Sequence, residues 1–476
     1  HSATRTVGHL DTRLRESTIT TKKENPTMHN YFSPSTSNVQ SCRKKTGKQR
    51  HSLIFLRLVT AALFISIGIL SQGIFAKELA PNQSWIGTWS SSPVEQGPAY
   101  EGHTLRQIVR ISIGGEQLRI RLSNRFGTEP LVISSASIGV RDVGSSVIPG
   151  TLRNLTFGGE PSVRIAAGSK VWSDPIELSV SDEEDLAVSL YVDENNTGGS
   201  TMHTLAWQTS YISSGDFTGD EIMPVDETTT SWFWLTGVDV MAQKNTLAVA
   251  TIGDSITEGC CLPEFTDANV RYPDQLARLL LEQYPGKPRA AVINAGISGN
   301  RILSDGGFLA RLGPNAQVRL DQDVLTQSGV THVILLIGVN DLGLGEADFG
   351  GGFVLGPVVQ ADDIIAGYKQ VIKRVQAAGM KILVGTILPF KGFALPGYWS
   401  PENEEKRQVI NEWIRTTDLH DGIVDFDEAI RDPDDPERML LIYDGGDALH
   451  PSAAGYERMA IEAEKALLKP GRGQIQ

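Results

Sequence analysis

The sequence predicts a chain in which an antiparallel β-sandwich or jelly roll is followed by a parallel, doubly wound α/β sheet. Three observations predict this fold class. Between about residues 85 and 241, apolar residues alternate with polar ones in several short segments, as in strands with one buried face. After residue 243, apolar strand-like runs alternate with helical stretches. The first of these runs, 247–252, stops at Gly253 and is followed by Ser255, where open α/β sheets place their ligand crevice.

Residues 1–76 are expected to form an N-terminal extension and a secretory signal peptide. Basic residues gather at 43–50, the segment 53–75 is apolar apart from Arg57, and Ala76 is a small closing residue. We therefore expect cleavage near Ala76 and a secreted or periplasmic protein, with Met28 as the true start. The alternative is a retained membrane anchor, because 53–75 is long enough to span a bilayer if Arg57 snorkels.

The charge of the remaining chain argues against two classes of partner. Residues 77–476 contain 32 Lys/Arg and 53 Asp/Glu, a formal net charge of −21. Such a surface repels nucleic acid and anionic membranes, so we expect neither nucleic acid nor stable membrane association after cleavage.

Cys260 and Cys261 are the only cysteines in residues 77–476. Adjacent cysteines make a poor structural bridge, so no disulfide framework is expected. No Cys/His cluster has metal-ligand spacing, so no metal is expected either.

Residues 77–243 are expected to form the β-sandwich as an accessory domain. Ile111/Ile113 and 118–122 follow the two-residue period, and Gly114-Gly115 between them predicts a hairpin turn. The same period recurs at 186–192. Aromatic groups in this region could line a sugar-binding face, although we favour packing in the core: Trp85/Trp89, Trp207/Tyr211 and Trp232/Trp234.

Residues 244–476 are expected to form the α/β domain. Its strand candidates are 247–252, 290–293, 332–337, 382–386 and 423–426. They alternate with helical stretches at 273–283, 316–326, 362–378, 404–416 and 453–468. Two long aromatic-containing segments, 341–360 and 388–401, follow strands and would lie over the carboxyl edge of the sheet. They either wall a pocket there or form flexible surface loops.

Four motif segments fall at strand-to-loop junctions: 253–255 (Gly-Asp-Ser), 294–301 (Asn-Ala-Gly-Ile-Ser-Gly-Asn-Arg), 338–341 (Gly-Val-Asn-Asp) and 447–451 (Asp-Ala-Leu-His-Pro). The first three follow three successive strand candidates. Because a parallel sheet brings the carboxyl ends of its strands to one edge, these segments should meet, with the fourth folding over them.

The residue types in these segments suit acyl transfer by serine. That chemistry needs a base for the hydroxyl proton, a group that orients the base, and donors for the developing oxyanion. His450 can take the proton of Ser255, and Asp447 can reach its other ring nitrogen if the Asp-x-x-His run forms a tight turn. The oxyanion donors would be the backbone N–H groups of Ser255 and Gly299 and the side-chain amide of Asn340.

Other candidates fit these roles less well. His332 begins a strand candidate and His420 lies in a predicted loop, and neither has a carboxylate at comparable spacing. Ser298 is a weaker candidate nucleophile, because its neighbour Gly299 is wanted as a donor.

The four motif segments resemble the blocks of the SGNH (GDSL) hydrolases, which carry Ser, Gly, Asn and His in that order. Over about residues 245–470, the resemblance implies a flavodoxin-like α/β/α sandwich with Ser255 as nucleophile. It places Gly299 and Asn340 in the oxyanion hole and completes a triad with Asp447 and His450. More loosely, three stretches are similar to secreted GDSL-type esterases with a β-domain before the catalytic domain: 87–90, 104–107 and 122–124. Cys260-Cys261 is a local departure from the family pattern.

We therefore expect a secreted, metal- and cofactor-independent serine esterase that works through an acyl-enzyme. The resemblance favours short-chain esters, acetyl above all, on a small-molecule or polysaccharide carbohydrate. A lipase, arylesterase or thioesterase of the same family is an alternative. A secreted carbohydrate-binding protein with a catalytically silent hydrolase fold is the alternative from another class.

Overall fold

The computed structural model describes residues 82–196, 198–282, 289–350, 353 and 355–468. The expected signal peptide and its alternative, a membrane anchor, lie outside these residues. Among the described helices, none has the length and apolar character needed to cross a bilayer. The described residues belong to one compact unit, so the β-rich and α/β parts are described together. The domain boundary expected after residue 243 stays a prediction.

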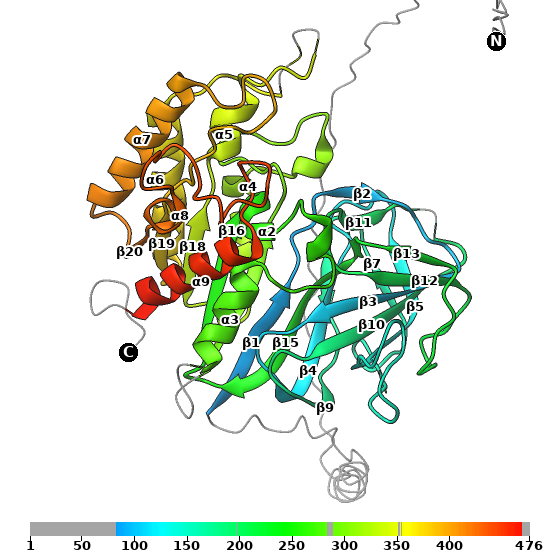
Figure 1. Ribbon diagram of the computed structural model, residues 1–476. Helices are drawn as coiled ribbons and strands as arrows, with labels where there is room; N and C mark the ends of the chain where they lie inside the picture. Colours follow the sequence, from blue (N-terminus) through cyan, green and yellow to red (C-terminus); the bar gives the residue numbers. More distant parts are fainter. Residues whose placement is uncertain (1–81, 197, 283–288, 351–352, 354, 469–476) are drawn as a thin grey trace, which may run out of the picture. The chain divides into compact units, whose positions relative to one another are not determined.

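A five-stranded parallel sheet forms the centre of the C-terminal half (Figure 1). Its strands are β16 (Leu247–Gly253), β17 (Ala290–Gly296), β18 (His332–Leu336), β19 (Lys381–Gly385) and β20 (Gly422–Val424). The spatial order is β17-β16-β18-β19-β20, which in chain order is the 2-1-3-4-5 arrangement of flavodoxin-like folds. The predicted α/β class is therefore confirmed.

Helices cover both faces of this sheet. They are α2 (Ser255–Glu258), α3 (Tyr272–Glu282), α4 (Ala316–Leu320), α5 (Val339–Leu344), α6 (Ala361–Ala377), α7 (Pro401–Thr416), α8 (Phe426–Ile430) and α9 (Ala453–Leu468). α3 packs against α9 on one face, and α4 and α7 pack against α6 on the other (Figure 1). The apolar positions of α6 recur every three or four residues, and this spacing buries one side of the helix against β19. The stretch 316–326, expected as one helix, is α4 followed by a π-helical turn at Asp321–Leu325.

Antiparallel sheets form the N-terminal half, as the alternation predicted. The first sheet contains β1 (Gln83–Ser90), β15 (Leu235–Gln243), β4 (Gly115–Ser123), β8 (Lys170–Trp172) and β9 (Ile176–Val180). The second contains β13 (Glu227–Thr229), β12 (Ser210–Ser214), β3 (His103–Arg110), β10 (Asp185–Val192), β5 (Leu131–Val140), β6 (Arg153–Asn154) and β7 (Val163–Ile165). A third, small sheet contains β14 (Trp232–Phe233), β11 (Ser200–His203) and β2 (Glu95–Gly97). Apolar side chains of the first two sheets share one core.

The hairpin predicted at Gly114-Gly115 is wrong. β3 and β4 belong to different sheets, so the segment between them crosses from one sheet to the other. The glycine serves close packing here, because a Cβ on Gly114 would collide with the backbone of Val180 and Ser181. Alternation in the sequence identifies strands but does not say which strands pair.

Three of the six aromatic residues considered for a sugar-binding face are core residues. Trp89, Trp232 and Trp234 are each at most 7% exposed. The Trp89 and Trp232 rings make an edge-to-face contact with centroids 4.8 Å apart. These side chains fill the sandwich, as favoured from the sequence.

The β-rich half covers the free edge of the parallel sheet at β17. The backbone N–H of Val292 donates to the Ser112 hydroxyl at 3.1 Å, and the Ser90 hydroxyl donates to the Asn294 carbonyl at 3.0 Å. An open edge strand would leave these backbone groups unpaired. The β-rich half therefore contacts the strand that leads directly into the second motif segment.

Candidate active site

Strand register brings the first three motif segments to one edge of the sheet. Gly253 at the end of β16 lies opposite Gly296 of β17 and Leu336 of β18. Ser255, Gly299 and Asn340 follow these aligned positions by two, three and four residues. All three therefore leave the same carboxyl edge.

A tight strand-to-helix turn presents Ser255. The Asp254 carboxylate caps α2 by accepting the Ile256 N–H at 3.0 Å, so Ser255 is the first residue of the helix. The turn requires glycine at 253, because a Cβ there would collide with the Thr257 side chain and the Leu336 carbonyl. Burial of Asp254 raises its pKa to about 7, against an ordinary value of 3.8.

His450 lies between Ser255 and Asp447. Its Nε2 is 2.9 Å from the Ser255 hydroxyl oxygen, and its Nδ1 is 2.6 Å from Asp447 Oδ2. Ser255 and His450 are both buried. An Nδ1–H donated to Asp447 leaves the Nε2 lone pair facing the serine proton, which is the tautomer a general base needs.

The Asp-x-x-His run is a tight turn held by its own backbone. Asp447 Oδ1 accepts the N–H groups of Leu449 and His450 at 2.9 and 2.8 Å. Ala448 has φ +62°, and its N–H donates to Asp444 at 3.0 Å. Burial acts to raise the pKa of Asp447. The hydrogen bonds that Asp447 accepts and its electrostatic attraction to His450 outweigh burial, so the pKa is lowered. Asp447 is therefore ionised at neutral pH.

The Asn340 amide is oriented by a residue from another loop. The hydroxyl of Tyr398 donates to Asn340 Oδ1 at 2.9 Å, and Asn340 Nδ2 donates to the Asn300 carbonyl at 3.2 Å. Tyr398 is 1% exposed. The amide N–H₂ is thereby turned toward the loop that carries Gly299. Gly299 has φ +72°, a conformation that favours glycine.

Two further buried groups hold this loop. Asp341 accepts the N–H groups of Ile302 and Leu303 at 2.8 and 3.0 Å, and burial raises its pKa to about 6. The fully buried Arg319 donates to backbone carbonyls at two strand ends, Gly253 O (2.8 Å) and Ala295 O (2.6 Å). Among its side-chain partners is Asn300 Oδ1 at 2.9 Å. From the sequence, Asp341 falls in a motif segment and Tyr398 in one of the two long aromatic-containing segments, but neither was expected to have a role and Arg319 was not singled out.

The serine and the two histidines that were weaker candidates for nucleophile and base make other contacts. Ser298 donates its hydroxyl to Glu258. His332 sits at the amino end of β18, opposite the edge that bears Ser255, and burial lowers its pKa to about 4. His420 contacts the Ile414 carbonyl through Nε2 at 2.8 Å.

Adjacent cysteines were expected to make a poor structural bridge, but Cys260 and Cys261 form a disulfide with each other. Neighbouring side chains in ordinary helix or strand conformations point apart. Cys261 instead has φ +89°, a left-handed conformation that is unusual for a residue with a Cβ. This local backbone brings the two sulfur atoms together.

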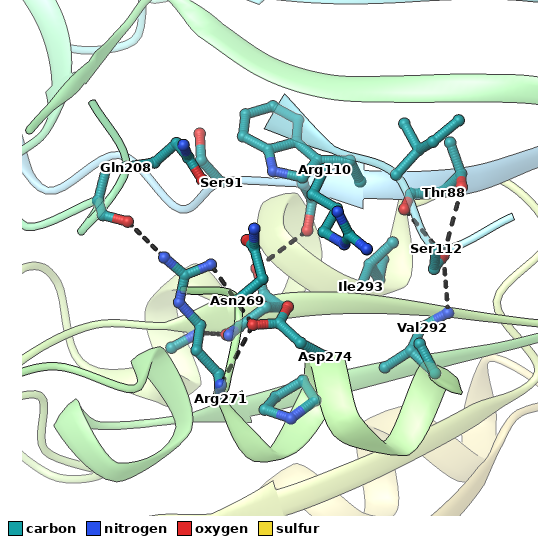
Figure 2. Close-up of a pocket in the computed structure, with 18 of the residues that line it drawn as sticks. Thr88, Ser91, Arg110, Ser112, Gln208, Asn269, Arg271, Asp274, Val292 and Ile293 are labelled. Atoms are coloured by element: carbon teal, nitrogen blue, oxygen red, sulfur yellow. Dashed lines mark hydrogen bonds and ion pairs between the residues drawn. The ribbon is translucent and has the colours of Figure 1, made fainter. Parts of the chain in front are cut away.

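A pocket where the β-rich and α/β halves meet is separate from this constellation (Figure 2). Its lining includes Trp89, Trp232, Arg271 and Asn294 as well as Glu258 of α2, but it does not include Ser255, Asp447 or His450. The cavity measures about 50 Å³, which suits a few water molecules. Figure 2 shows Thr88, Ser112 and Val292 joined by hydrogen bonds at its side. The pocket belongs to the packing between the halves.

A parallel α/β fold with a serine, a histidine and an aspartate in hydrogen-bonded series defines a hydrolase of the serine type. Residues 251–458 match the model of the GDSL-like lipase/acylhydrolase family. This match supports the assignment of residues 251–458 to the SGNH/GDSL hydrolases and the interpretation of this region as a carboxylic ester hydrolase.

Solved structures of low sequence identity are similar to part of the chain. A carbohydrate acetylesterase from Sinorhizobium meliloti is 17% identical, with 46% of this chain and 98% of that chain covered and a TM-score of 0.35. The native aryl esterase of M. smegmatis is 18% identical, with 46% and 97% covered and a TM-score of 0.35. A GDSL-like lipase from Bacteroides thetaiotaomicron is 16% identical, with 46% and 86% covered and a TM-score of 0.32. These scores lie below 0.5, so the family assignment rests on the sequence match. No curated protein matches the chain.

Proposed function

We propose that this chain is a secreted serine esterase that hydrolyses short-chain esters, acetyl above all, on carbohydrate. Ser255 is the nucleophile, His450 the general base and Asp447 the group that orients and charges the imidazole. Ser255 N–H, Gly299 N–H and the Asn340 amide form the oxyanion hole. The observation that carries the proposal is the pair of hydrogen bonds on His450, at 2.9 Å to Ser255 and 2.6 Å to Asp447.

The reaction follows from these contacts. Ser255 Oγ attacks the ester carbonyl as its proton passes to His450 Nε2, and the carbonyl oxygen becomes an anion facing the three donors. Collapse of this intermediate expels the alcohol, which takes the proton from His450 and leaves an acyl-serine. Water then attacks the acyl group through the same base, releasing the carboxylic acid and restoring Ser255.

One contact supports a small acyl group. The Leu312 side chain lies against Gly299, so closely that a Cβ on the glycine would collide with it. This apolar side chain crowds the loop that holds the candidate oxyanion donor. The carbohydrate alcohol rests on the family resemblance, and the acidic surface expected of residues 77–476 suits an uncharged partner better than a polyanionic one.

A fluorophosphonate probe tests the nucleophile. We expect stoichiometric labelling of folded wild-type protein at Ser255, located by peptide mass spectrometry, and no labelling of Ser255→Ala. Ser298→Ala is the matched control and should still be labelled stoichiometrically at Ser255, because its hydroxyl supports the Gly299 loop and is not the nucleophile. An unlabelled Ser255 in folded protein would support the silent carbohydrate-binding alternative.

An ester panel tests the substrate class. We expect p-nitrophenyl acetate and acetylated xylan to be hydrolysed with the highest kcat/KM, and the rate to fall as the acyl chain lengthens. A maximum at octanoate or longer would exclude the short-chain assignment.

For secretion, N-terminal sequencing of the exported protein should locate a new terminus near residue 77; an intact segment 53–75 in a membrane fraction would identify the anchor instead.

A specific observation favours a second candidate, an esterase for longer or aromatic esters. Phe308 and Phe353 make an edge-to-face contact with centroids 4.8 Å apart, and they are 66% and 45% exposed. They lie on the loops that follow β17 and β18, the same strands that lead to Gly299 and Asn340. Phe308→Ala should selectively lower kcat/KM for the long-chain esters of the panel if this pair binds the acyl chain.

A further inference from the structure

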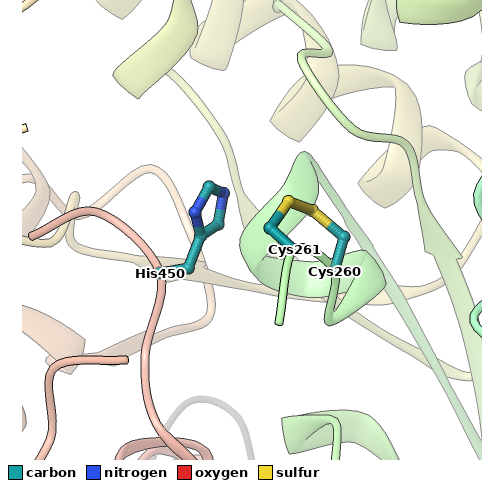
Figure 3. Close-up of side chains that lie close together, drawn as sticks. All are labelled: Cys260, Cys261 and His450. Carbon is teal, nitrogen blue, oxygen red and sulfur yellow. A yellow bond between two sulfur atoms is a disulfide. The ribbon is translucent and has the colours of Figure 1, made fainter. Parts of the chain in front are cut away.

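Cys260, Cys261 and His450 lie together (Figure 3), and His450 contacts the proposed catalytic Ser255 at 2.9 Å. Cys260 follows directly on α2 and Gly259, and its N–H donates to the Ser255 carbonyl at 3.2 Å. The two sulfur atoms and an imidazole nitrogen all lie within 4.8 Å of one another. Cys260 is buried, whereas Cys261 is exposed, so a reductant in solution can reach the disulfide.

These donors form a ligand set for a thiophilic divalent cation. Two cysteine thiolates and one histidine nitrogen bind Zn²⁺ in known site types, with Zn–S distances of about 2.3 Å and Zn–N distances of about 2.0–2.1 Å. Donors around such an ion are therefore roughly 3–4 Å apart. The three donor atoms of this cluster lie within 4.8 Å of one another, so they need to move only slightly closer. The disulfide prevents this use of the sulfur atoms, because a metal ligand must be a thiolate.

His450 already has the surroundings of a metal ligand. Histidine ligands usually donate their second ring N–H to a carboxylate, which fixes the tautomer and raises the basicity of the other nitrogen. Asp447 does this at His450 Nδ1, at 2.6 Å. The Nε2 lone pair now faces Ser255 at 2.9 Å, so a metal ion bound at Nε2 would compete directly with the serine hydroxyl.

We propose that reduction of the Cys260–Cys261 disulfide creates a three-ligand site for Zn²⁺ or a similar thiophilic cation, completed by His450, and that the bound ion stops ester hydrolysis. Thiol–disulfide exchange with a dithiol supplies the reduction: the S–S bond breaks, two electrons and two protons pass to the cysteine sulfur atoms, and the dithiol becomes a disulfide. Metal binding then displaces the two thiol protons. The inhibition rests on the proposed role of His450 as base.

Co²⁺ titration tests the site without reference to activity. Wild-type protein is reduced with a dithiol, freed of reductant without air, and titrated with Co²⁺. We expect one Co²⁺ per chain, with the intense near-ultraviolet thiolate-to-cobalt absorption and visible bands of a four-coordinate ion. The oxidised protein and the double variant Cys260→Ser/Cys261→Ser should lack the thiolate band. Absence of this band in the reduced wild type overturns the proposal, and its presence without prior reduction overturns the redox control.

Esterase assays on the same samples test the consequence. Stoichiometric Zn²⁺ should lower kcat of the reduced wild type at least tenfold, and a chelator should restore it. The oxidised protein and the double variant should keep their activity at that Zn²⁺ concentration. Equal inhibition of all three samples would place the inhibitory ion elsewhere and overturn the inference.

His450→Ala separates this inference from the proposed function. The variant should bind Co²⁺ at least tenfold more weakly after reduction while still forming thiolate bonds; an unchanged affinity would remove His450 from the site. If His450→Ala keeps full esterase activity while Co²⁺ binding is weakened, the proposed catalytic role fails and the metal site stands, but the inhibition is overturned.

Discussion

His203 Nε2 lies 3.0 Å from Glu258 Oε1, and this contact links the β-rich half to the helix that begins with Ser255. Both side chains are about 5% exposed or less. His203 is anchored in turn by the Ser92 carbonyl, 2.7 Å from Nδ1. The other Glu258 oxygen accepts the hydroxyl of Ser298, next to Gly299. The β-rich half thus supports the loop that carries a candidate oxyanion donor.

Replacing His203 should therefore impair turnover more than substrate binding. His203→Ala removes a partner from a buried carboxylate, which costs about 1–3 kcal/mol of unfolding free energy, and it frees the Ser298–Gly299 loop. We expect a lower kcat with nearly unchanged KM, and partial rescue by His203→Gln, whose amide can still donate to Glu258. His103→Ala, in β3, is the control. Equal kcat for His203→Ala and wild type at a temperature where both are folded would contradict the link.

Asn340→Ala should slow the chemical step. Loss of one side-chain oxyanion donor typically costs about 2.7–4 kcal/mol, or roughly 10²–10³ in kcat. Folding should change little if the cavity fills with water, which denaturant unfolding can check. A rate within twofold of the wild type would remove Asn340 from the oxyanion hole.

Tyr398→Phe should show a weaker form of the same defect. The ring still packs, but the amide oxygen of Asn340 loses its 2.9 Å donor and the amide is free to turn. One hydrogen bond of about 0.5–1.5 kcal/mol corresponds to a two- to tenfold fall in kcat. In the background of Asn340→Ala the substitution should have no further effect on kcat, because the two residues act through one amide. Additive losses would show that Tyr398 acts by another route.

Asp447→Asn should lower kcat by up to about 10⁴-fold, because an amide in place of the carboxylate favours the wrong imidazole tautomer and removes the charge that stabilises imidazolium. The lowered pKa of Asp447 keeps it ionised from neutral pH down to below its ordinary value of 3.8. An acid limb of the wild-type kcat/KM profile near pH 6–7 should therefore not be assigned to Asp447. Steady-state kinetics with a soluble p-nitrophenyl ester measure both effects. A variant that keeps wild-type kcat would exclude the triad.

Asp254→Asn should flatten the pH dependence of stability. The folded chain keeps the Asp254 proton up to about pH 7, whereas the unfolded chain loses it near 3.8. The stabilising effect of protonation is therefore complete below pH 3.8 and is lost as the pH rises through 7. Asparagine keeps the acceptor for the Ile256 N–H and cannot ionise. Urea unfolding from pH 4 to 8 should show a steeper decline for the wild type; parallel curves would contradict the raised pKa.

Much of this arrangement was predictable from local sequence. The apolar run before Gly253 and the position of Ser255 two residues after Gly253 identify the strand-to-helix turn, because few residue types allow that backbone. Asp447 and His450 are three positions apart, so their contact requires only a tight turn. The pairing of β3 with β10 instead of β4 was not predictable, since alternation is a property of one strand and pairing is a property of two.

The sequence by itself determined the fold class of the C-terminal half and the residues that meet at its carboxyl edge, because hydrophobic periodicity and short motifs act over a few neighbouring positions. Only the tertiary structure decided which distant groups support them. Tyr398 reaches Asn340 across 58 positions, and His203 in β11 reaches Glu258 in α2. The tertiary structure also places the Cys260–Cys261 disulfide beside His450. Such contacts depend on how whole elements pack, and no local pattern in the chain encodes that packing.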